Sequence, residues 1–323
     1  MKKILIANDL LQGGGVETIL YTLVCYLVEH EYEVSLMIPD CNEKDIAELF
    51  GTNVKLYPKL RKLKYIKRFT LRWFYDRGLF IIESIFYYIK FWSKQFDVVL
   101  ALKEGLVTQE TAHLYGKKKI AWIHIDYSVM HTTKDIFGSV EAERKCMKKY
   151  DTIVCVSYAV KKSVISTVGD TGNLCVRYNP INYREIREKA KEEIEEFNNN
   201  KCPLFLAMGR LDYPKNYSTL IEICKEISAH DLFELWIIGD GPEREELQKK
   251  INDYNLNCVK LLGTKMNPFP YLAKADVFIS TSLVESYGLA IQEALILGKP
   301  VVALNCPAIE ETFDDRFGIL FNP

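Results

Sequence analysis

The chain has 323 residues, of which 48% are hydrophobic, so it is long enough for two globular domains with well-packed cores. Its formal net charge of −1 excludes a global electrostatic field that would attract a nucleic acid. The two halves differ, because residues 1–180 carry 26 basic and 20 acidic side chains whereas residues 181–323 carry 16 and 23. A net charge of +6 followed by one of −7 indicates different partners for the two halves.

Cysteine usage and apolar runs indicate a cytoplasmic protein. The nine cysteines are scattered and form no Cys-x-x-Cys pair, a pattern of reduced core thiols rather than of a zinc site or a disulfide framework. The N-terminal apolar run is too short for a signal peptide. Since no run approaches about 20 apolar residues, no membrane span is predicted.

Short apolar runs that predict buried parallel strands recur through the first half, and predicted helices separate them. These runs cover residues 2–7, 34–38, 98–101, 120–123 and 153–156. The alternation is typical of a doubly wound parallel sheet.

A glycine loop follows the first predicted strand. Gly13, Gly14 and Gly15 would let the backbone approach a ligand closely and would open a helix. Thr18 stands where a dinucleotide-binding fingerprint requires its last glycine, so the sequence argues against an NAD site.

The segment from Lys59 to Lys94 interrupts this alternation. Seven basic residues precede its first acid, and aromatic residues follow closely: Lys59, Arg61, Lys62, Lys64, Lys67, Arg68 and Arg72, then Trp73, Phe74, Tyr75, Phe80, Phe86, Tyr87, Tyr88, Phe91 and Trp92. This composition favours contact with an anionic membrane surface. A core helix with a solvated basic face fits the same composition. A nucleic-acid partner is not predicted, because no recognition motif accompanies the basic residues.

His124 and Asp126 come just after a predicted strand. Ligands bind at the carboxyl ends of strands in α/β sheets, where a histidine orients a sugar or accepts a proton. A histidine that is hydrogen-bonded within a loop fits the sequence equally well. Ser157, which follows the next strand, is predicted to cap a helix.

Pro180 and a change to acidic composition place the domain boundary at 180/181, within the crossing segment that extends to about residue 201. Arg210 and Lys215 lie in the loop after the next predicted strand, where a guanidinium and an ammonium would clamp a diphosphate. Two solvated surface charges are the alternative. Further on, Pro242 is predicted at the first position of a helix, and the loop from Thr264 to Asn267 would touch a base.

The stretch from Ala275 to Leu304 combines a buried strand, a turn and a helix that stops at Gly298. The backbone amides from Tyr287 to Leu289 would suit a phosphate at the helix N-terminus. Glu285 in the turn and Glu293 in the helix would suit the hydroxyls of a sugar and a ribose. An ordinary strand–turn–helix unit with two surface glutamates remains the alternative.

Five motifs in order resemble glycosyltransferase family 4 of the bacterial surface-polysaccharide type. They are "GGVE" at Gly14, "GRLDYPKN" at Gly209, "IGDGPEREEL" at Ile238, "LLGTKMN" at Leu261 and "ESYGLAIQE" at Glu285. The resemblance covers nearly the whole chain. It implies the GT-B fold, in which two Rossmann-like doubly wound parallel-sheet domains face a central cleft. Residues 1–180 would then bind the acceptor and residues 181–323 the nucleotide-sugar.

The resemblance also implies roles for individual residues. Arg210 and Lys215 would bind the donor diphosphate, Glu293 the ribose hydroxyls, and Glu285 the hydroxyls of the donor sugar. The expected donor-binding residues are Gly14, Gly15, Arg210, Lys215, Gly263, Lys265, Met266, Glu285, Ser286, Tyr287, Gly288, Leu289 and Glu293. The expected acceptor-binding residues are Gly15, His124 and Asp126, and the expected catalytic residues are Glu285, His124, Arg210 and Lys215.

The implied reaction is a retaining, metal-independent hexosyl transfer from a UDP-sugar to a saccharide or lipid-linked saccharide, as in capsule biosynthesis. The sequence contains no Asp-x-Asp motif of metal-dependent transferases, and Arg210, Lys215 and a helix N-terminus would replace the metal electrostatically. Such an enzyme would act in the cytoplasm at the inner face of the membrane. A catalytically silent nucleotide-sugar-binding partner of another transferase, or an epimerase on the same fold, are the alternatives. Family members continue beyond "FGILFNP" with helices that cross back to the first domain, so the second domain is expected to be truncated.

Overall fold

The computed structural model describes residues 1–9, 14–39, 41, 43–51, 53–59, 96–194 and 202–322. The chain divides into two compact units, Met1–Ile181 and Asn182–Pro323. Apart from Lys59, the basic and aromatic segment predicted to contact a membrane lies outside the described residues.

The N-terminal unit is built on a seven-stranded sheet in the order β3-β2-β1-β4-β5-β6-β7, and all neighbouring strands are parallel. Its central strands β1 and β2 are buried apolar runs, with four of five and six of seven residues buried. This is the pattern of a sheet covered on both faces. The strands are β1 (Lys3–Ala7), β2 (Glu33–Pro39), β3 (Lys55–Lys59), β4 (Phe96–Ala101), β5 (Gly116–Ile123), β6 (Thr152–Cys155) and β7 (Leu174–Val176).

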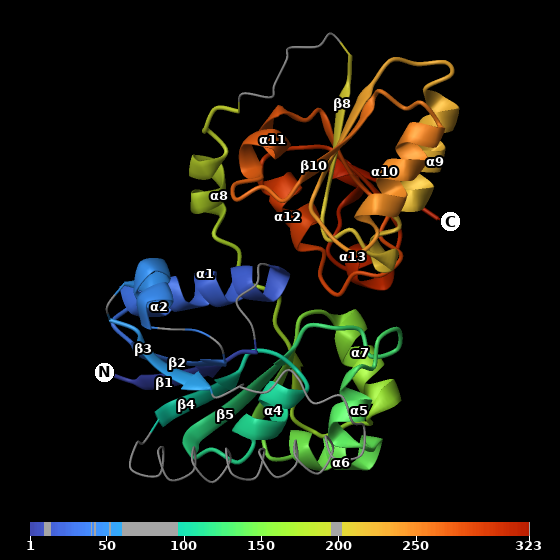
Figure 1. The fold of residues 1–323 in the computed structure, drawn as a ribbon. Helices are drawn as coiled ribbons and strands as arrows, with labels where there is room; N and C mark the ends of the chain where they lie inside the picture. Colours follow the sequence, from blue (N-terminus) through green and yellow to red (C-terminus); the bar gives the residue numbers. More distant parts are fainter. Residues whose placement is uncertain are drawn as a thin grey trace, which may run out of the picture. The chain divides into compact units, whose positions relative to one another are not determined.

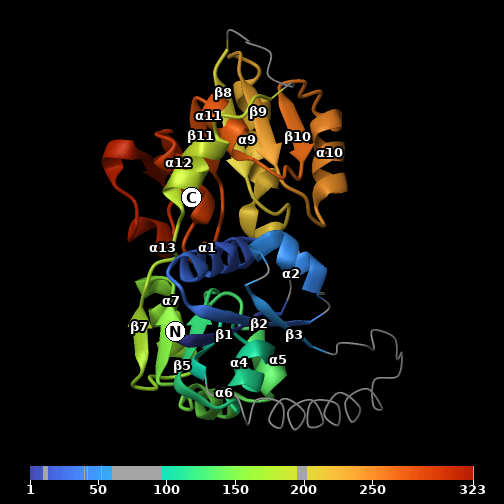
Figure 2. The same cartoon turned by 90° about the vertical axis from the view of Figure 1, so that its left-hand side faces the viewer.

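Helices connect these parallel strands. Figures 1 and 2 show α1 and α2 on one face of the sheet and α4, α5 and α6 on the other. The predicted cap of α7 is confirmed, because Ser157 Oγ accepts a hydrogen bond from the Val160 amide at 3.1 Å. The helices are α1 (Gly15–Glu29), α2 (Glu43–Phe50), α4 (Leu106–Thr111), α5 (Thr133–Phe137), α6 (Val140–Met147) and α7 (Tyr158–Thr167).

The C-terminal unit contains a six-stranded, all-parallel sheet in the order β10-β9-β8-β11-β12-β13. The strands are β8 (Leu204–Met208), β9 (Glu234–Ile238), β10 (Val259–Gly263), β11 (Val277–Ser280), β12 (Val301–Leu304) and β13 (Gly318–Phe321). The helices are α8 (Tyr183–Lys189), α9 (Tyr217–Ile227), α10 (Arg244–Asp253), α11 (Phe269–Lys274), α12 (Leu289–Ile296) and α13 (Pro307–Glu310), with 3₁₀ turns at Tyr213–Lys215 and Asp315–Phe317.

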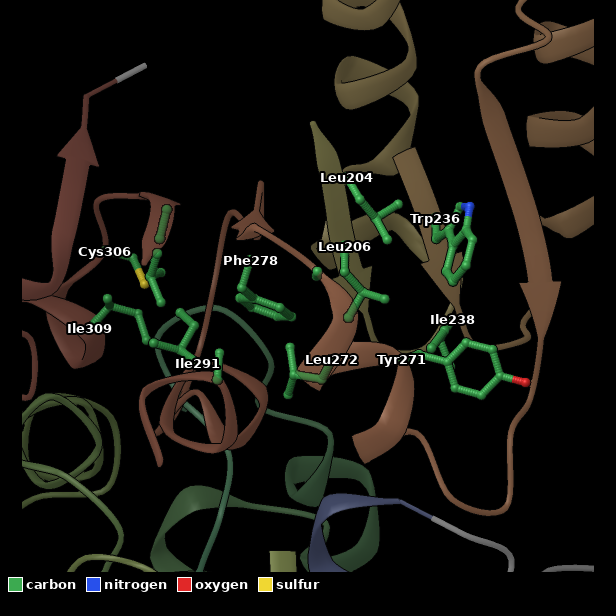
Figure 3. Close-up of a cluster of buried hydrophobic side chains, with 14 residues drawn as sticks. Leu204, Leu206, Trp236, Ile238, Tyr271, Leu272, Phe278, Ile291, Cys306 and Ile309 are labelled. Atoms are coloured by element: carbon green, nitrogen blue, oxygen red, sulfur yellow. The ribbon is translucent and has the colours of Figure 1, made fainter. Parts of the chain in front are cut away.

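Two buried clusters hold this second sheet between its helices. One contains Leu206 and Phe278 from the strands together with Leu272 of α11 and Ile291 of α12, as Figure 3 shows. The other packs Leu220 of α9 and neighbouring apolar side chains of α10 against the opposite face. Burial of each such aliphatic or aromatic side chain contributes roughly 1.5–3 kcal/mol, and the sheet core therefore fixes the strand ends from which the candidate site is built.

The predicted doubly wound parallel sheets are confirmed in both units. The prediction for Pro242 is wrong. It lies two residues before the first residue of α10, and Glu243 occupies the N-cap position of this helix. The sequence favoured Pro242 because proline suits a first helical turn, but here the chain makes a further turn before the helix begins.

Candidate functional site

The candidate site of the C-terminal unit lies at the carboxyl ends of two central strands, β8 and β11. Strand β8 pairs with β9 on one side and with β11 on the other, so the loops that follow β8 and β11 leave the sheet at its topological switch point. Open α/β sheets bind ligands at such a point. Arg210 and Lys215 follow β8, whereas Glu285 follows β11.

Lys215 and Glu285 form an ion pair that joins these two loops. The Lys215 Nζ atom lies 2.5 Å from Oε1 of Glu285, and the two side chains are 23% and 14% exposed. Partial burial reduces solvent screening, so the pair is stronger than one on an open surface. A cation and an acid that are 70 positions apart in the sequence therefore meet at one point.

Hydrogen bonds to main-chain carbonyl oxygens also join these two loops. Thr281 Oγ1 donates to the carbonyl oxygen of Lys215 at 3.0 Å and to that of Asn216 at 3.2 Å. The Leu283 amide donates to the Pro214 carbonyl at 2.8 Å. The two loops are therefore held together independently of the charged side chains.

Arg210 is exposed to solvent on the same loop as Lys215. Its side chain is 73% exposed, and its Nε atom lies 3.5 Å from Oδ2 of Asp212. Burial raises the pKa of the Asp212 carboxyl, while the positive charges of Arg210 and Lys215 oppose that rise. The loop after β8 thus places two cations around one carboxyl, and the exposed guanidinium presents further N–H donors outward.

Two glycines bring the loops after β8 and β9 into direct backbone contact. A Cβ atom at Gly239 would lie 1.9 Å from the Gly209 carbonyl oxygen, and one at Gly241 would lie 2.3 Å from that of Leu211. Both distances are far below van der Waals contact. The Gly-Asp-Gly sequence is therefore explained by the packing of these loops, which also fixes the position of Arg210.

Glu293 lies one turn inside α12, the helix that follows the Glu285 turn. Gly288 precedes this helix with a left-handed φ of 74°, and a side chain there would come within 2.4 Å of Ile309 Cδ1. The N–H groups of the first helical turn, from Leu289 onward, have no partner within the helix. Burial raises the pKa of the half-buried Glu293 carboxyl to about 7. Helix α12 thus carries an acid with a pKa near neutral pH. Its N-terminus is connected to Glu285 by a short stretch that contains Ser286 and the buried Tyr287.

Gly263, Lys265 and Met266 belong to the end of β10 and the loop after it, and β9 separates β10 from β8. The Lys265 ammonium lies over the Tyr271 ring, 4.9 Å from its centroid, and Met266 is fully exposed. These residues lie two strands from the Lys215–Glu285 pair along the same edge of the sheet.

In the N-terminal unit, His124 lies directly after β5 and is buried. Its amide donates to Oε2 of Glu104 at 2.8 Å. Burial lowers the pKa of the His124 imidazole to about 4, and its Nε2 atom is buried without a hydrogen-bond partner among the described residues. A neutral imidazole with such a nitrogen is suited to bind a polar group of a ligand.

Asp126 lies two residues after His124 in the same loop. Its Oδ1 atom accepts hydrogen bonds from the Ser128 amide at 2.9 Å and from the Ser128 hydroxyl at 2.5 Å. This carboxylate therefore stabilises its own turn. Gly14 and Gly15 are exposed: Gly14 is the N-cap residue of α1, and Gly15 is its first residue. This helix follows β1, which lies next to β4 in the sheet.

Three residues that hold these elements were not singled out from the sequence. They are Asp212 beside Arg210, Thr281 beneath Lys215, and Glu104 beneath His124. Glu104 follows the end of β4 as His124 follows β5, so the rule that pointed to His124 applies equally to it. In the described part of the chain, no group of three or more metal-ligating side chains comes together, and no helix is both long and apolar enough to cross a bilayer.

Comparison with known proteins identifies the class to which these units belong. Two Rossmann-like parallel-sheet units in one chain form the GT-B fold. Residues 13–185 match the sequence profile "Glycosyltransferase Family 4", and residues 188–323 match "Glycosyl transferases group 1". Because the first match alone covers more than half of the chain, the chain belongs to glycosyltransferase family 4.

The comparisons also find individual proteins that the chain resembles. An N-acetylgalactosamine-N,N'-diacetylbacillosaminyl-diphospho-undecaprenol 4-alpha-N-acetylgalactosaminyltransferase of Campylobacter jejuni is 35% identical over 45% of this chain, a stretch that spans 39% of its own length. An "uncharacterized 41.2 kDa protein in cps region" of Klebsiella pneumoniae is 25% identical over 96% of this chain and 83% of its own length. Among solved structures, Anabaena Alr3699/HepE in complex with UDP superposes with a TM-score of 0.76 at 18% identity, covering all of this chain and 86% of HepE.

Proposed function

We propose that the protein is a retaining glycosyltransferase that transfers a hexose from a UDP-sugar to a saccharide or a lipid-linked saccharide during the synthesis of a cell-surface polysaccharide. The observation that carries this proposal is the Lys215–Glu285 pair at the switch point of the second sheet, with Arg210 on the same loop and the N-terminus of α12 beyond Glu285. This combination offers positive charge and oriented amides for a diphosphate and a carboxylate for sugar hydroxyls.

The donor would lie along the carboxyl edge of the second sheet. Arg210 and Lys215 would contact its diphosphate, and Ser286 to Leu289 would offer backbone amides to the diphosphate and the sugar. Glu285 would exchange its contact with Lys215 for hydrogen bonds from the sugar hydroxyls. Glu293 would accept hydrogen bonds from the ribose. The loop from Gly263 to Met266 follows β10, two strands from β8 along the same sheet edge, and it would contact the base of the nucleotide.

This arrangement addresses the main electrostatic demand of the reaction. When the glycosidic bond to the diphosphate breaks, negative charge develops on the leaving phosphate. A guanidinium, an ammonium and a helix N-terminus that are already in place stabilise that charge more in the transition state than in the ground state. In this proposal they take the part that a divalent metal has in other sugar transferases. The leaving phosphate itself would accept the proton of the attacking hydroxyl.

The acceptor would bind to the N-terminal unit near His124, with Gly15 contributing backbone. Two relatives suggest the chemical class of the substrates: the Campylobacter jejuni enzyme is named for a diphospho-undecaprenol-linked acceptor, and HepE binds UDP. A lipid-linked acceptor would place the protein in the cytoplasm at the inner face of the membrane, where the segment from Lys59 to Lys94 would contact anionic lipid.

Mass spectrometry of reaction products tests this function. The purified protein would be incubated with UDP-glucose, UDP-galactose, UDP-N-acetylglucosamine, UDP-N-acetylgalactosamine or GDP-mannose and a lipid-diphosphate-linked saccharide, with and without EDTA. We expect release of UDP and an acceptor heavier by one sugar, with EDTA present or absent, and loss of both products in Glu285→Gln. Proton NMR of the product should show the anomeric configuration of the donor. Conversion of one UDP-sugar into its epimer without transfer, or inversion of the anomeric centre, would contradict the proposal.

A further inference from the structure

A buried carboxyl in the N-terminal unit has no part in the reaction outlined above. Glu104 lies in the loop between β4 and α4, is buried, and accepts the His124 amide hydrogen bond through Oε2 at 2.8 Å. The next residue, Gly105, has a left-handed φ of 85°, and a Cβ atom there would lie 2.9 Å from Ile136 Cδ1. The backbone at this loop is therefore tightly constrained, and it points the Glu104 carboxyl at the end of β5.

The His124 ring lies next to the Leu102 backbone, directly after β4. A hydrogen bond to the Leu102 backbone raises the pKa of the imidazole, although burial lowers it more. Such a bond raises that pKa because the ring donates its N–H to a carbonyl oxygen. Nε2 has no hydrogen-bond partner among the described residues, so the bonded nitrogen is Nδ1. Since the imidazole is neutral, Nε2 carries a lone pair and no proton.

A buried acid at position 104 is unfavourable for folding. Burial raises the pKa of the Glu104 carboxyl, and the hydrogen bonds from the His124 amide and from its own backbone oppose that rise. The neighbouring ammonium of Lys103 bonds instead to Oδ1 of Asp9 at 3.1 Å. A buried ionisable group that is compensated mainly by one amide of a candidate site residue is more typical of a functional position than of a packing position.

A second buried carboxyl anchors the far end of the same segment. Glu143 of α6 accepts hydrogen bonds from Nε2 of His131 at 2.8 Å and from Oγ1 of Thr133 at 2.7 Å. The segment between His124 and Thr133 is thus fixed at both ends, but only the Glu104 end contacts His124. Glu143 therefore provides a matched control for burial of a carboxyl that does not touch the imidazole-bearing residue.

We propose that Glu104 is a positioning residue that fixes the His124 backbone so that the imidazole presents an unprotonated Nε2 as a hydrogen-bond acceptor for a hydroxyl group of a saccharide substrate. The inference deepens the proposed function and rests on it for the identity of the ligand. The geometric part, namely that Glu104 holds the His124 backbone in the position from which its ring meets the Leu102 backbone, is independent of any activity.

NMR of the histidine rings tests the geometric part directly. The chain has five histidines, so selective ¹⁵N labelling gives a simple long-range ¹H–¹⁵N spectrum, and His124→Asn assigns the signal of interest. In the wild type we expect the Nδ1-protonated tautomer throughout pH 5 to 8, without titration. Glu104→Gln, whose side-chain oxygen still accepts the amide hydrogen bond, should preserve this signal. Glu143→Gln should preserve it as well.

Glu104→Ala removes the acceptor and should give mixed tautomers and a ring that titrates near the ordinary histidine pKa of about 6.5. If this variant does not fold by circular dichroism, Glu104→Met fills the volume without accepting a hydrogen bond and takes its place. A wild-type spectrum in Glu104→Ala or Glu104→Met would overturn the inference, as would a Glu104→Gln spectrum equal to that of Glu104→Ala.

Kinetics test the connection to the substrate. With the lipid-linked saccharide as acceptor, Glu104→Ala should lower kcat/KM for the acceptor about 10-fold and leave the affinity for UDP-glucose unchanged, whereas Glu104→Gln should restore most of the loss. An unchanged acceptor kcat/KM in Glu104→Ala would refute the substrate role. If the wild type transfers no sugar at all, the proposed function fails, and the NMR experiment still decides whether Glu104 positions His124.

Discussion

Nucleotide-sugar binding should depend on pH through Glu293. Burial raises the pKa of this carboxyl to about 7 in the unliganded protein. Ribose hydroxyls donate hydrogen bonds and therefore favour the charged carboxylate, which lowers the pKa in the complex. Because the ligand lowers the pKa, binding must become tighter as the pH rises through 7 and weaker as it falls.

The magnitude follows from the shift. Roughly nine-tenths of a group with a pKa of about 7 is protonated at pH 6 and roughly one-tenth at pH 8. If the carboxylate stays charged in the complex, the dissociation constant should therefore fall about 10-fold from pH 6 to pH 8, which corresponds to about 1.4 kcal/mol. Binding at pH 7 should release about half a proton.

Isothermal titration calorimetry with UDP-glucose measures both quantities, because its diphosphate has no proton to lose near neutral pH. Titrations in buffers of different ionisation enthalpy give the number of protons released. In Glu293→Gln the proton release and the pH dependence should both disappear, and binding at pH 8 should weaken. Glu310→Gln, which changes an exposed carboxyl on α13 of the same unit, should behave as the wild type. Equal pH profiles for the wild type and Glu293→Gln would refute the ribose assignment.

Three further outcomes are expected. Arg210→Ala should lower kcat/KM about 10²-fold or more by removing a charge that stabilises the leaving diphosphate, and a folded variant with the normal rate would contradict this role. Gly239→Ala should lower the free energy of unfolding in urea by about 3 kcal/mol or more, because its Cβ atom would lie 1.9 Å from a carbonyl oxygen. The control Gly298→Ala also has a left-handed φ but has open space around it, and it should lower this free energy by about 1 kcal/mol. In the predicted membrane segment, glutamine would replace four basic residues: Lys62, Lys64, Lys67 and Arg68. This change should reduce co-sedimentation with anionic vesicles, by about 1 kcal/mol of membrane-binding free energy per charge, without changing the affinity for UDP-glucose. Equal binding of the wild type to neutral and anionic vesicles would count against membrane attachment.

The sequence predicted the sheets well because strand signals are local. Buried parallel strands appear as uninterrupted apolar runs, and helix ends carry their own signals: Ser157 caps α7, and Gly298 follows the end of α12 with a left-handed φ of 72°. The prediction for Pro242 was wrong because the fixed φ of proline suits both the first turn of a helix and a turn that precedes a helix.

Such local signals do not predict which side chains pair with each other within the candidate site. The sequence suggested Arg210 and Lys215 as one clamp, but the structure pairs Lys215 with Glu285 and places Arg210 against Asp212. The sequence places Asp126 beside His124, and it does not reveal that this carboxylate also accepts a hydrogen bond from the Ser128 amide. These choices depend on how loops from different strands approach each other, which in turn depends on close backbone contacts such as that of Gly239 with Gly209.

The tie between the loops after β8 and β11 gives the C-terminal site a simple mechanical property. Thr281 and the Leu283 amide bind main-chain oxygens rather than side chains, so the loops stay joined whatever side chains stand at the contacted positions. A ligand that draws Lys215 away from Glu285 would therefore move side chains over an unchanged backbone. Hydrogen exchange at the single Leu283 amide reports on both loops at once, and a slow rate that is the same with and without nucleotide is the signature of a site that is rigid before it is filled.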